Sequence, residues 1–355
     1  MTRTGNHKFD PLATDADSRR RFPVTFGGLL LAGYLAVTGY QAHAADPPAP
    51  FRVGVVGLDT SHSIAFTKAM NADPADPAMQ NCRVVVAYPW GSKTIESSSS
   101  RVPGYIEEIQ KLGVDVVDSI EALLDRVDGV LLETNDGNPR REQVMEIFAA
   151  GKPVFMDKPV AASLADVLAI YDAAESMGVP TFSSSSLRYA EGVQEVRAGE
   201  IGRVLGCETF SPCALEPSHD DFYWYGIHGV EMLYTCMGVG CESVTRTSSA
   251  GFDVAVGLWS DGRIGSFRGI RQGKASYGGT AFGEQAIRSI GPYRGYNPLV
   301  VEIAQFFRTG EPPVSAAETI ELYAFMSAAD ESKRLGGAPV KLADVIAKAR
   351  AEANE

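Results

Sequence analysis

Short hydrophobic runs and amphipathic stretches alternate along the chain between residues 51 and 180. Apolar runs that end at a glycine or a turn predict buried parallel strands at residues 52–57, 83–87, 114–116, 129–132 and 153–156. Helical spacing predicts helices between them at residues 63–70, 105–112, 119–124, 141–149 and 163–177. The first of these helices has Ser61 or Ser63 as its expected cap. Strands that alternate with such helices indicate βαβ units and a parallel sheet.

The pattern changes after about residue 181. Strand-like runs at residues 204–210, 243–248, 253–258 and 264–269 follow one another with few helices between them. Asp261-Gly262 is a hairpin turn signal between two of these runs. Helical spacing returns at residues 298–309, 316–335 and 342–351. We therefore expect a linker at residues 45–50, a domain at 51–180 and a second α+β domain at 181–355 with a mostly antiparallel open sheet.

The first 44 residues have the features of an export signal rather than of a folded domain. Arg19, Arg20 and Arg21 precede an almost uncharged stretch from Val24 to Val37, which is shorter than the ~20 residues that span a bilayer as a helix. Ala42-His43-Ala44 follows as a small-residue cleavage site. The paired arginines resemble the twin-arginine signal, which exports folded proteins. We expect residues 1–44 to be removed and the protein to be periplasmic, or otherwise exported, with no membrane segment left. The alternative is an uncleaved membrane anchor.

Composition and charge exclude several classes of partner. Of the 355 residues, 45% are hydrophobic, which is too many for a disordered chain, and the net charge is −12. Such an acidic protein is expected to bind neither nucleic acid nor an anionic membrane. The five cysteines show no metal-binding spacing. They are expected to be buried free thiols, and the alternative is a pair between Cys236 and Cys241.

The turn after the first strand has the context of a phosphate-binding turn but an altered sequence. Gly57-Leu58-Asp59-Thr60-Ser61-His62 leads from the strand into a helix. Only the first glycine of the G-x-G-x-x-G pattern is present, because Asp59 and His62 take the other two glycine positions. Thr60, Ser61 and the helix N-terminus remain as donors for an anion. The context still predicts a Rossmann-like doubly wound parallel sheet, and the alternative is an α/β turn that binds no nucleotide.

Asp59 and Tyr88 both depart from what a dinucleotide needs. A carboxylate 4 Å from a phosphate is repelled by roughly 4 kcal/mol at an effective dielectric near 20. Asp59 must therefore point away, bind a cation, or mark a lost pyrophosphate site. Tyr88 ends the second strand, where an acidic residue would bind the ribose. Ser92 and Lys93 follow it and could take a 2′-phosphate, which would favour NADP, although a solvated loop lysine is the simpler interpretation.

The segment Gly151-Lys152-Pro153-Val154-Phe155-Met156-Asp157-Lys158-Pro159 resembles the G-K-x-V-x-x-E-K-P signature of the Gfo/Idh/MocA oxidoreductases. Two further segments are similar to motifs of that family, namely residues 186–189 (SLRY) and 226–231 (GIHGVE). The resemblance implies a Rossmann domain that binds NAD or NADP and a second domain with an open sheet. That sheet would carry the substrate site and the contact of a homo-oligomer. The implied substrate is a small carbohydrate or polyol.

Residue roles follow from the same resemblance. Lys158 would be a catalytic lysine near the nicotinamide and the substrate hydroxyl, and His228 would be the acid/base, since its pKa lies near working pH. The implied cofactor-binding residues are Gly57, Leu58, Asp59, Thr60, Ser61, His62, Tyr88, Thr134, Asn135, Asp157 and Lys158. The implied substrate residues are Arg188, Tyr189, Trp224, Tyr225 and Glu231. The alternatives are a turn lysine and a hydrogen-bonded core histidine.

Several positions depart from the family pattern. Asp157 replaces a glutamate, and Trp224 replaces an aspartate that would orient His228. Arg140 stands where the family usually has a histidine. The aromatic run at residues 222–225 fits either the core or a wall that stacks on a sugar ring. The histidines and nearby acids show no ligand spacing, so no metal site is expected.

Two functions of different classes follow from these observations. The first is an exported NAD(P)-linked oxidoreductase that acts on a sugar or polyol carbon and retains its cofactor. Lys158, His228 and the export signal favour it. The second is a carbohydrate-binding or scaffold protein on the same fold without a cofactor. Asp59 and Tyr88 favour this second function.

Overall fold

The computed structural model describes residues 49–353. The predicted export signal at residues 1–44 lies outside the described residues, so its function stays a prediction. Within the described part of the chain, no helix is both long enough and apolar enough to cross a membrane. The described residues form one compact unit that contains two sheets.

The first sheet has six strands in the order β3-β2-β1-β4-β5-β6, and every pairing in it is parallel. This is the strand order of a Rossmann fold. Its strands are β1 (Phe51–Val56), β2 (Cys82–Tyr88), β3 (Asp115–Val116), β4 (Gly129–Leu132), β5 (Val154–Met156) and β6 (Thr181–Ser183). The strand order reverses between β1 and β4, because the chain runs from β1 to β2 and β3 on one side and from β4 to β5 and β6 on the other. A crevice is therefore expected at the carboxyl ends of β1 and β4.

The helices of this half follow the predicted alternation with the strands. They are α1 (Ser61–Met70), η1 (Pro77–Met79), α2 (Glu96–Ser99), α3 (Val102–Lys111), α4 (Ile120–Leu124), α5 (Arg140–Ala149) and α6 (Leu164–Met177). The prediction of a serine cap for α1 was wrong. The cap is Thr60, whose hydroxyl accepts a hydrogen bond of 3.4 Å from the backbone N–H of His62. The helix therefore begins two residues earlier than predicted.

The second sheet has seven strands in the order β12-β11-β7-β10-β9-β8-β13. Only the pairing of β7 with β10 is parallel, which confirms the mostly antiparallel prediction. Its strands are β7 (Val204–Pro212), β8 (Cys241–Ser248), β9 (Phe252–Trp259), β10 (Ile264–Ile270), β11 (Gly278–Gly283), β12 (Ile287–Ile290) and β13 (Val340–Lys341). The sequence pattern missed β6, β11, β12 and β13, which are short or rich in glycine.

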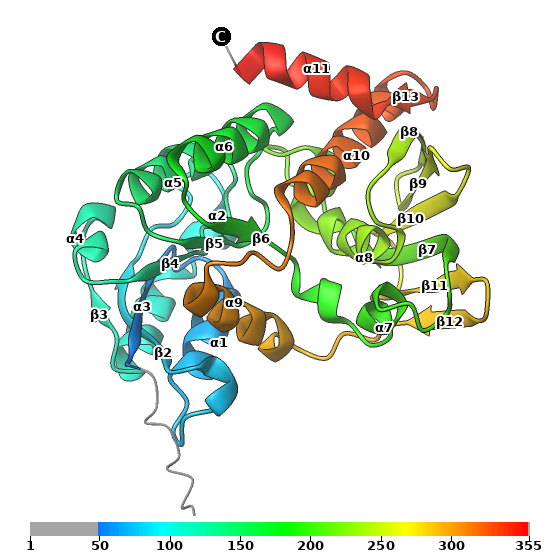
Figure 1. Ribbon diagram of the computed structural model, residues 1–355. Coiled ribbons are helices and arrows are strands. Elements are labelled where there is room, and N and C mark those ends of the chain that lie inside the picture. Colours follow the sequence, from blue (N-terminus) through cyan, green and yellow to red (C-terminus); the bar gives the residue numbers. More distant parts are fainter. Residues whose placement is uncertain (1–48, 354–355) are drawn as a thin grey trace, which may run out of the picture. The chain divides into compact units, whose positions relative to one another are not determined.

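The remaining helices connect and cover the two sheets (Figure 1). They are η2 (Ser186–Tyr189), α7 (Val193–Arg197), the π-helical turn η3 (Phe222–Gly226), α8 (Ile227–Met237), α9 (Asn297–Thr309), α10 (Ala316–Arg334) and α11 (Leu342–Ala353). Helix α8 packs against β7 and β10, and α10 packs against β8. Helix α9 contacts α1, so a late segment of the chain completes the core around the parallel sheet.

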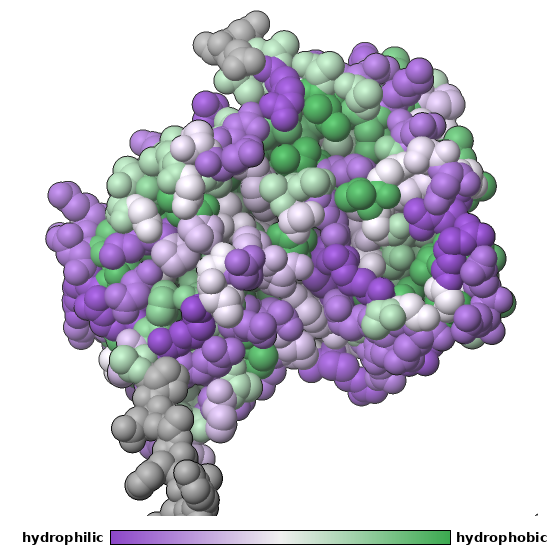
Figure 2. Space-filling model, in the orientation of Figure 1, coloured by the Kyte–Doolittle hydropathy of each residue, from purple (hydrophilic) through white to green (hydrophobic). Residues whose placement is uncertain are grey.

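The second sheet keeps several large apolar side chains in solvent. Side chains along β9 and β10 alternate between buried and more accessible positions, as expected for a sheet with one covered face. The exposed apolar residues of this sheet are Leu205, Phe252, Leu258, Ile264, Phe282 and Ile287. Figure 2 shows apolar patches between polar ones on the side where β7, β11 and β12 lie.

Candidate functional site

The altered turn is held tightly against the end of β4. Gly57 has a φ of +99°, and a Cβ atom there would lie 2.6 Å from the backbone nitrogen of Thr134. Only glycine therefore allows the two turns to approach this closely. Gly57 and Leu58 are buried in the turn, and neither lines the cavity that opens beside the N-terminus of α1. Gly57, which the sequence suggests for cofactor binding, is therefore required here for the close packing of the two turns.

Asp59 points away from the cavity, which is the first of the three alternatives considered for it. Its carboxylate is fully buried and accepts hydrogen bonds from the Ser98 hydroxyl at 2.6 Å and from the backbone N–H of Asn135 at 3.0 Å. Burial raises the pKa of Asp59, and these hydrogen bonds lower it in part. Ser98 comes from the short helix α2, which buries its side chain against Asp59.

A cavity of about 330 Å³ opens beside the N-terminus of α1. It lies between the carboxyl ends of the parallel strands and the second sheet's helix α8, which is where an open α/β sheet usually binds ligands. The lining residues are Thr60, Ser61, His62, Ser97, Arg101, Tyr105, Asn135, Lys158, Ser186, Leu187, Trp224, Tyr225, His228, Tyr277, Tyr293 and Tyr296. The cavity therefore combines helix-end donors, two candidate catalytic groups and a wall of tyrosines.

Lys158 reaches this cavity directly after β5. Its side chain is almost completely buried, and its Nζ lies 5.5 Å from the centroid of the Tyr225 ring. Burial lowers the pKa of Lys158, and the neighbouring Asp157 carboxylate partly opposes this effect. A lysine amine that loses its proton more readily than usual can accept a proton from a substrate hydroxyl.

His228 faces the same cavity from α8. Its Nδ1 atom lies 2.7 Å from the Ser185 hydroxyl oxygen, so Nε2 is the ring nitrogen that can meet a ligand. Burial lowers the pKa of His228 well below its usual value, and the positive charge of Lys158 lowers it further. The imidazole is therefore neutral at pH 7 and can accept a proton. Lys158 and His228, separated by 70 positions in the sequence, line one cavity.

A cluster of buried polar side chains lies below the cavity, at the ends of β4 and β5. The His62 Nδ1 atom is 2.7 Å from a carboxylate oxygen of Asp157. Arg140 donates hydrogen bonds from Nε to the backbone oxygen of Thr134 at 2.8 Å and from Nη1 to that of Asp157 at 2.6 Å. Arg140 therefore ties the two strand ends together. Glu133 is fully buried beside them, and burial raises its pKa well above the usual value.

Other predicted site residues lie away from the cavity. Tyr88 lines a separate hollow of about 250 Å³ with Trp90 and Gln143, and Thr134 donates its hydroxyl hydrogen to Gln143. Two predicted substrate residues, Arg188 and Glu231, form a buried ion pair of 2.6 Å. Tyr189 packs at the edge of the core around the parallel sheet. These residues support the structure around the cavity instead of lining it.

Sequence reasoning missed several residues that matter to the site. They are Arg101, Tyr105, Glu133, Ser185, Tyr277 and Tyr293. Tyr105 lies on α3, whereas Tyr277 and Tyr293 come from the loops before β11 and α9. No spacing in the sequence links these tyrosines to Lys158. Glu133 follows a predicted strand, which was the only available signal for it. The five cysteines are free and buried, which confirms the prediction for them.

The donor set of the cavity fits the nicotinamide and phosphate half of a dinucleotide. Thr60, Ser61 and His62 present the N-terminus of α1, which favours an anion. Arg101 adds a cationic side chain and Asn135 adds an amide. The buried Asp59 carboxylate is directed to Ser98 and Asn135, so it does not face a group bound at this helix end.

Comparisons with known proteins agree with this geometry. A family model described as "Oxidoreductase family, NAD-binding Rossmann fold" (GFO_IDH_MocA) matches residues 51–184. An uncharacterised oxidoreductase of Streptococcus pneumoniae is 28% identical over 155 residues, which cover 39% of this chain and 42% of that protein. The chain therefore matches less than half the length of that relative.

Solved structures share the fold over most of the described chain. The myo-inositol 2-dehydrogenase of Lactobacillus plantarum has a TM-score of 0.67 and 16% identity, with 82% of this chain and 99% of that one covered. The myo-inositol dehydrogenase of Lactobacillus casei, in complex with NAD(H) and myo-inositol, has a TM-score of 0.65 and 17% identity, with 82% and 96% covered. The family-model match over residues 51–184, the Rossmann strand order and the cavity agree, and this part of the chain is similar to the Gfo/Idh/MocA oxidoreductases.

Proposed function

We propose that the protein is an NAD(P)-linked oxidoreductase that oxidises or reduces a hydroxyl-bearing carbon of a sugar or cyclic polyol. The observation that carries this proposal is the convergence of Lys158 and His228 in one cavity beside the N-terminus of α1. Burial lowers the pKa of both groups, so each loses its proton more readily than an exposed lysine or histidine would and can act as a proton acceptor. The family-model match over residues 51–184 and a structural neighbour in complex with NAD(H) support the same function.

Named residues have separate roles in this proposal. Thr60, Ser61 and Arg101 would hold the phosphates of the cofactor, which supplies hydride transfer when it is bound. Lys158 binds and orients the substrate hydroxyl. His228 accepts or returns the hydroxyl proton through Nε2, since Ser185 holds Nδ1.

The wall of the cavity supports a sugar or cyclic polyol as the substrate class. The cavity that His228 lines is also lined by Trp224, Tyr225, Tyr277, Tyr293 and Tyr296. Their ring faces can pack on the C–H groups of a sugar ring, and their hydroxyls can bind its oxygens. The inositol bound by the Lactobacillus casei neighbour is a molecule of this class. An apolar substrate would leave these hydroxyls unpaired.

Export and assembly are further parts of the proposal. The arginines at 19 and 20 and the small residues at 42–44 support export with the cofactor already bound, and the expected mature protein begins at Ala45. Intact mass of the exported form tests this. The exposed apolar face of the second sheet supports a homo-oligomer through that sheet. Charged substitutions at Ile264 and Ile287 are expected to reduce the oligomer to monomers in light scattering.

The activity is tested with a panel of inositols, aldoses and alditols, each with NAD and with NADP, by following absorbance of the reduced cofactor. Wild-type protein is expected to turn over at least one of them. Lys158→Met is expected to lower kcat by roughly 10²-fold or more while the far-UV spectrum stays unchanged. Lys152→Met, a nearby lysine that does not line the cavity, is the matched control.

Three results are distinguishable in this test. Turnover that is lost only in Lys158→Met supports the proposal. Turnover that survives Lys158→Met removes this lysine from the chemistry. Binding of a carbohydrate without binding of either dinucleotide would favour the cofactor-free carbohydrate-binding function and contradict the proposal.

A further inference from the structure

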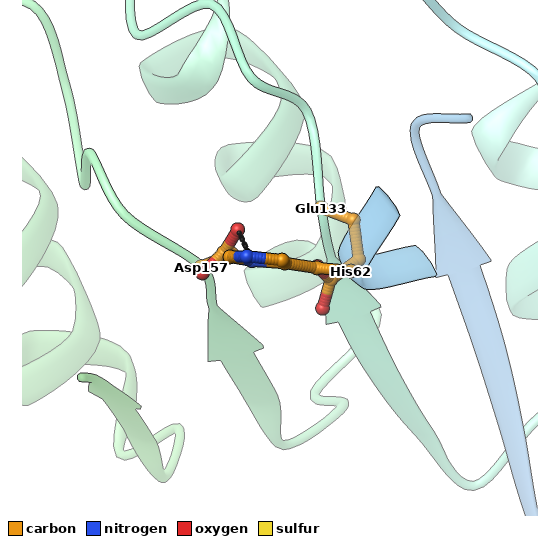
Figure 3. A group of neighbouring side chains, drawn as sticks. All are labelled: His62, Glu133 and Asp157. Atoms are coloured by element: carbon orange, nitrogen blue, oxygen red, sulfur yellow. Dashed lines mark hydrogen bonds and ion pairs between the residues drawn. The ribbon is translucent and has the colours of Figure 1, made fainter. Parts of the chain in front are cut away.

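Three potential metal ligands converge below the cavity at the ends of two parallel strands. His62 comes from the first turn of α1, Glu133 directly follows β4 and Asp157 directly follows β5 (Figure 3). One ligand atom from each side chain can be chosen so that all three lie within 4.8 Å of one another. The group is buried except for His62, which also lines the cavity.

Glu133 is the observation that sets this group apart from an ordinary hydrogen-bonded cluster. Its side chain is 0% exposed, and neither carboxylate oxygen has a hydrogen-bond partner. A buried carboxylate without any partner is costly, and native structures rarely leave one unsatisfied. Its two oxygens therefore call for a partner that the side chains of the described residues do not provide.

The nearby cations do not fill this role. Arg140 directs Nε and Nη1 to the backbone oxygens of Thr134 and Asp157. The Lys158 ammonium group lies near the Tyr225 ring, on the cavity side. Neither side chain donates a hydrogen bond to Glu133. Neither oxygen of Glu133 therefore has a hydrogen bond from a cationic side chain of the described residues.

We propose that His62, Glu133 and Asp157 form a binding site for a divalent transition-metal ion, with Mn²⁺ and Zn²⁺ as the favoured ions. One imidazole nitrogen and two carboxylates are a ligand set that both ions accept. Ligand atoms about 2.1 Å from an ion lie about 3.0–4.2 Å apart, so a separation of 4.8 Å exceeds the upper end of this range by about 0.6 Å. The site goes beyond the proposed oxidoreductase function and does not depend on it.

The position of this site gives the ion access to the cavity. Three protein ligands leave coordination positions free for water or for a ligand oxygen. His62 belongs both to the group and to the cavity wall, so the ion would lie next to the space that Lys158 and His228 line. The ion is therefore expected to bind oxygen-rich ligands that enter the cavity, and its own binding needs no dinucleotide.

The test measures metal binding by the purified full-length protein after treatment with a chelator and its removal. Mn²⁺ and Zn²⁺ are added separately, and bound metal is counted by equilibrium dialysis and elemental mass spectrometry. Wild type is expected to bind one equivalent of at least one ion and to gain thermal stability from it. Glu133→Gln is expected to weaken this binding by at least about 10²-fold, because it removes a charged ligand.

Asp59→Asn is the matched control, since Asp59 is another buried acid at the same sheet edge whose oxygens already have partners. It should bind the metal as wild type does. His62→Gln is a second ligand variant and should also lose metal binding. It serves as the test if Glu133→Gln does not fold. Co²⁺ added in place of these ions absorbs in the visible range in a way that reports its coordination geometry, and this spectrum should change or be lost in His62→Gln.

Two results would overturn the proposal. One is wild-type protein that binds neither ion stoichiometrically, which would leave Glu133 as a protonated buried acid. The other is stoichiometric binding that Glu133→Gln and His62→Gln both retain, which would place the ion elsewhere. Both readouts are independent of turnover, so the metal site and the oxidoreductase function can fail separately.

Discussion

The Nδ1 atom of His228 lies 2.7 Å from the hydroxyl oxygen of Ser185, although 43 residues separate them in the sequence. The family resemblance places an orienting carboxylate four residues before this histidine, where the chain has Trp224. Ser185 also accepts a hydrogen bond of 3.1 Å from the backbone N–H of Leu187, which fixes the position of its oxygen. A neutral hydroxyl thus takes over the orienting contact, and it leaves the buried imidazole uncharged.

Removal of this hydroxyl should lower activity without abolishing it. Ser185→Ala is expected to reduce kcat by about 10-fold, less than the roughly 10²-fold or greater loss expected for His228→Ala, because the base remains but is poorly oriented. Ser185→Thr keeps the hydroxyl and should restore most of the rate. The pH profile of kcat distinguishes positioning from a purely structural role. An unchanged profile with unchanged kcat in Ser185→Ala would show that the contact does not matter.

Protonation of His228 should destabilise the folded protein in acid. Its pKa is lowered well below the usual value of about 6.5 because the ring is buried, so the unfolded state binds the proton more readily. The favourable contribution is present above the unfolded pKa and is lost as pH falls below about 6.5 toward the folded pKa. Each unit of lowering is worth about 1.4 kcal/mol.

His228→Gln removes this group and keeps a polar side chain for Ser185. Urea unfolding at several values between pH 7.5 and pH 5 is expected to show a steeper loss of the free energy of unfolding in wild type than in the variant. His219 is another buried histidine with a lowered pKa, and it is present in both proteins, so it cancels in the comparison. Parallel curves for the two proteins would contradict the prediction.

The Asp59 carboxylate is expected to stabilise the folded protein and not to repel the phosphates of a bound dinucleotide. Asp59→Gly leaves the Ser98 hydroxyl and the Asn135 N–H without their partner, and we expect a loss of about 1–3 kcal/mol in the free energy of unfolding. Asp59→Asn keeps an acceptor for Asn135 and should lose less. NADH titration of both variants completes the test. Tighter NADH binding by Asp59→Gly with unchanged stability would mean that the carboxylate does face the cofactor.

Local patterns were sufficient for the order and kind of most elements. The strand at residues 129–132 was predicted with the bounds of β4, because a short apolar run between turn signals has few other structures available. The bounds of the helix at 316–335 differ from those of α10 by one residue. The strands β11 and β12 were missed because glycine-rich, partly polar segments carry a weak signal and form a sheet only through their neighbours.

The site was less predictable, because it depends on contacts between distant segments. Lys158 and His228 were found through a resemblance, and the structure places both in one cavity. Arg188 and Glu231 resembled substrate residues, and the structure pairs them with each other. Glu133 could not be singled out, because its lack of a partner becomes visible only when β4, β5 and α1 are packed together. Spacing along the chain carries no information of this kind.

The central claim is that this cavity holds a dinucleotide beside Lys158 and His228, and release and rebinding of that cofactor test it most directly. Denatured wild-type protein should release NAD or NADP, identified by mass, and the stripped protein should rebind the reduced form with a change in its fluorescence. Arg101→Ala should weaken rebinding by roughly 10-fold, the loss expected when a charge-assisted contact to phosphate is removed. Arg126→Ala, whose side chain pairs with Asp115 outside the cavity, should not. Wild-type protein that releases no dinucleotide and rebinds neither reduced form would contradict the account.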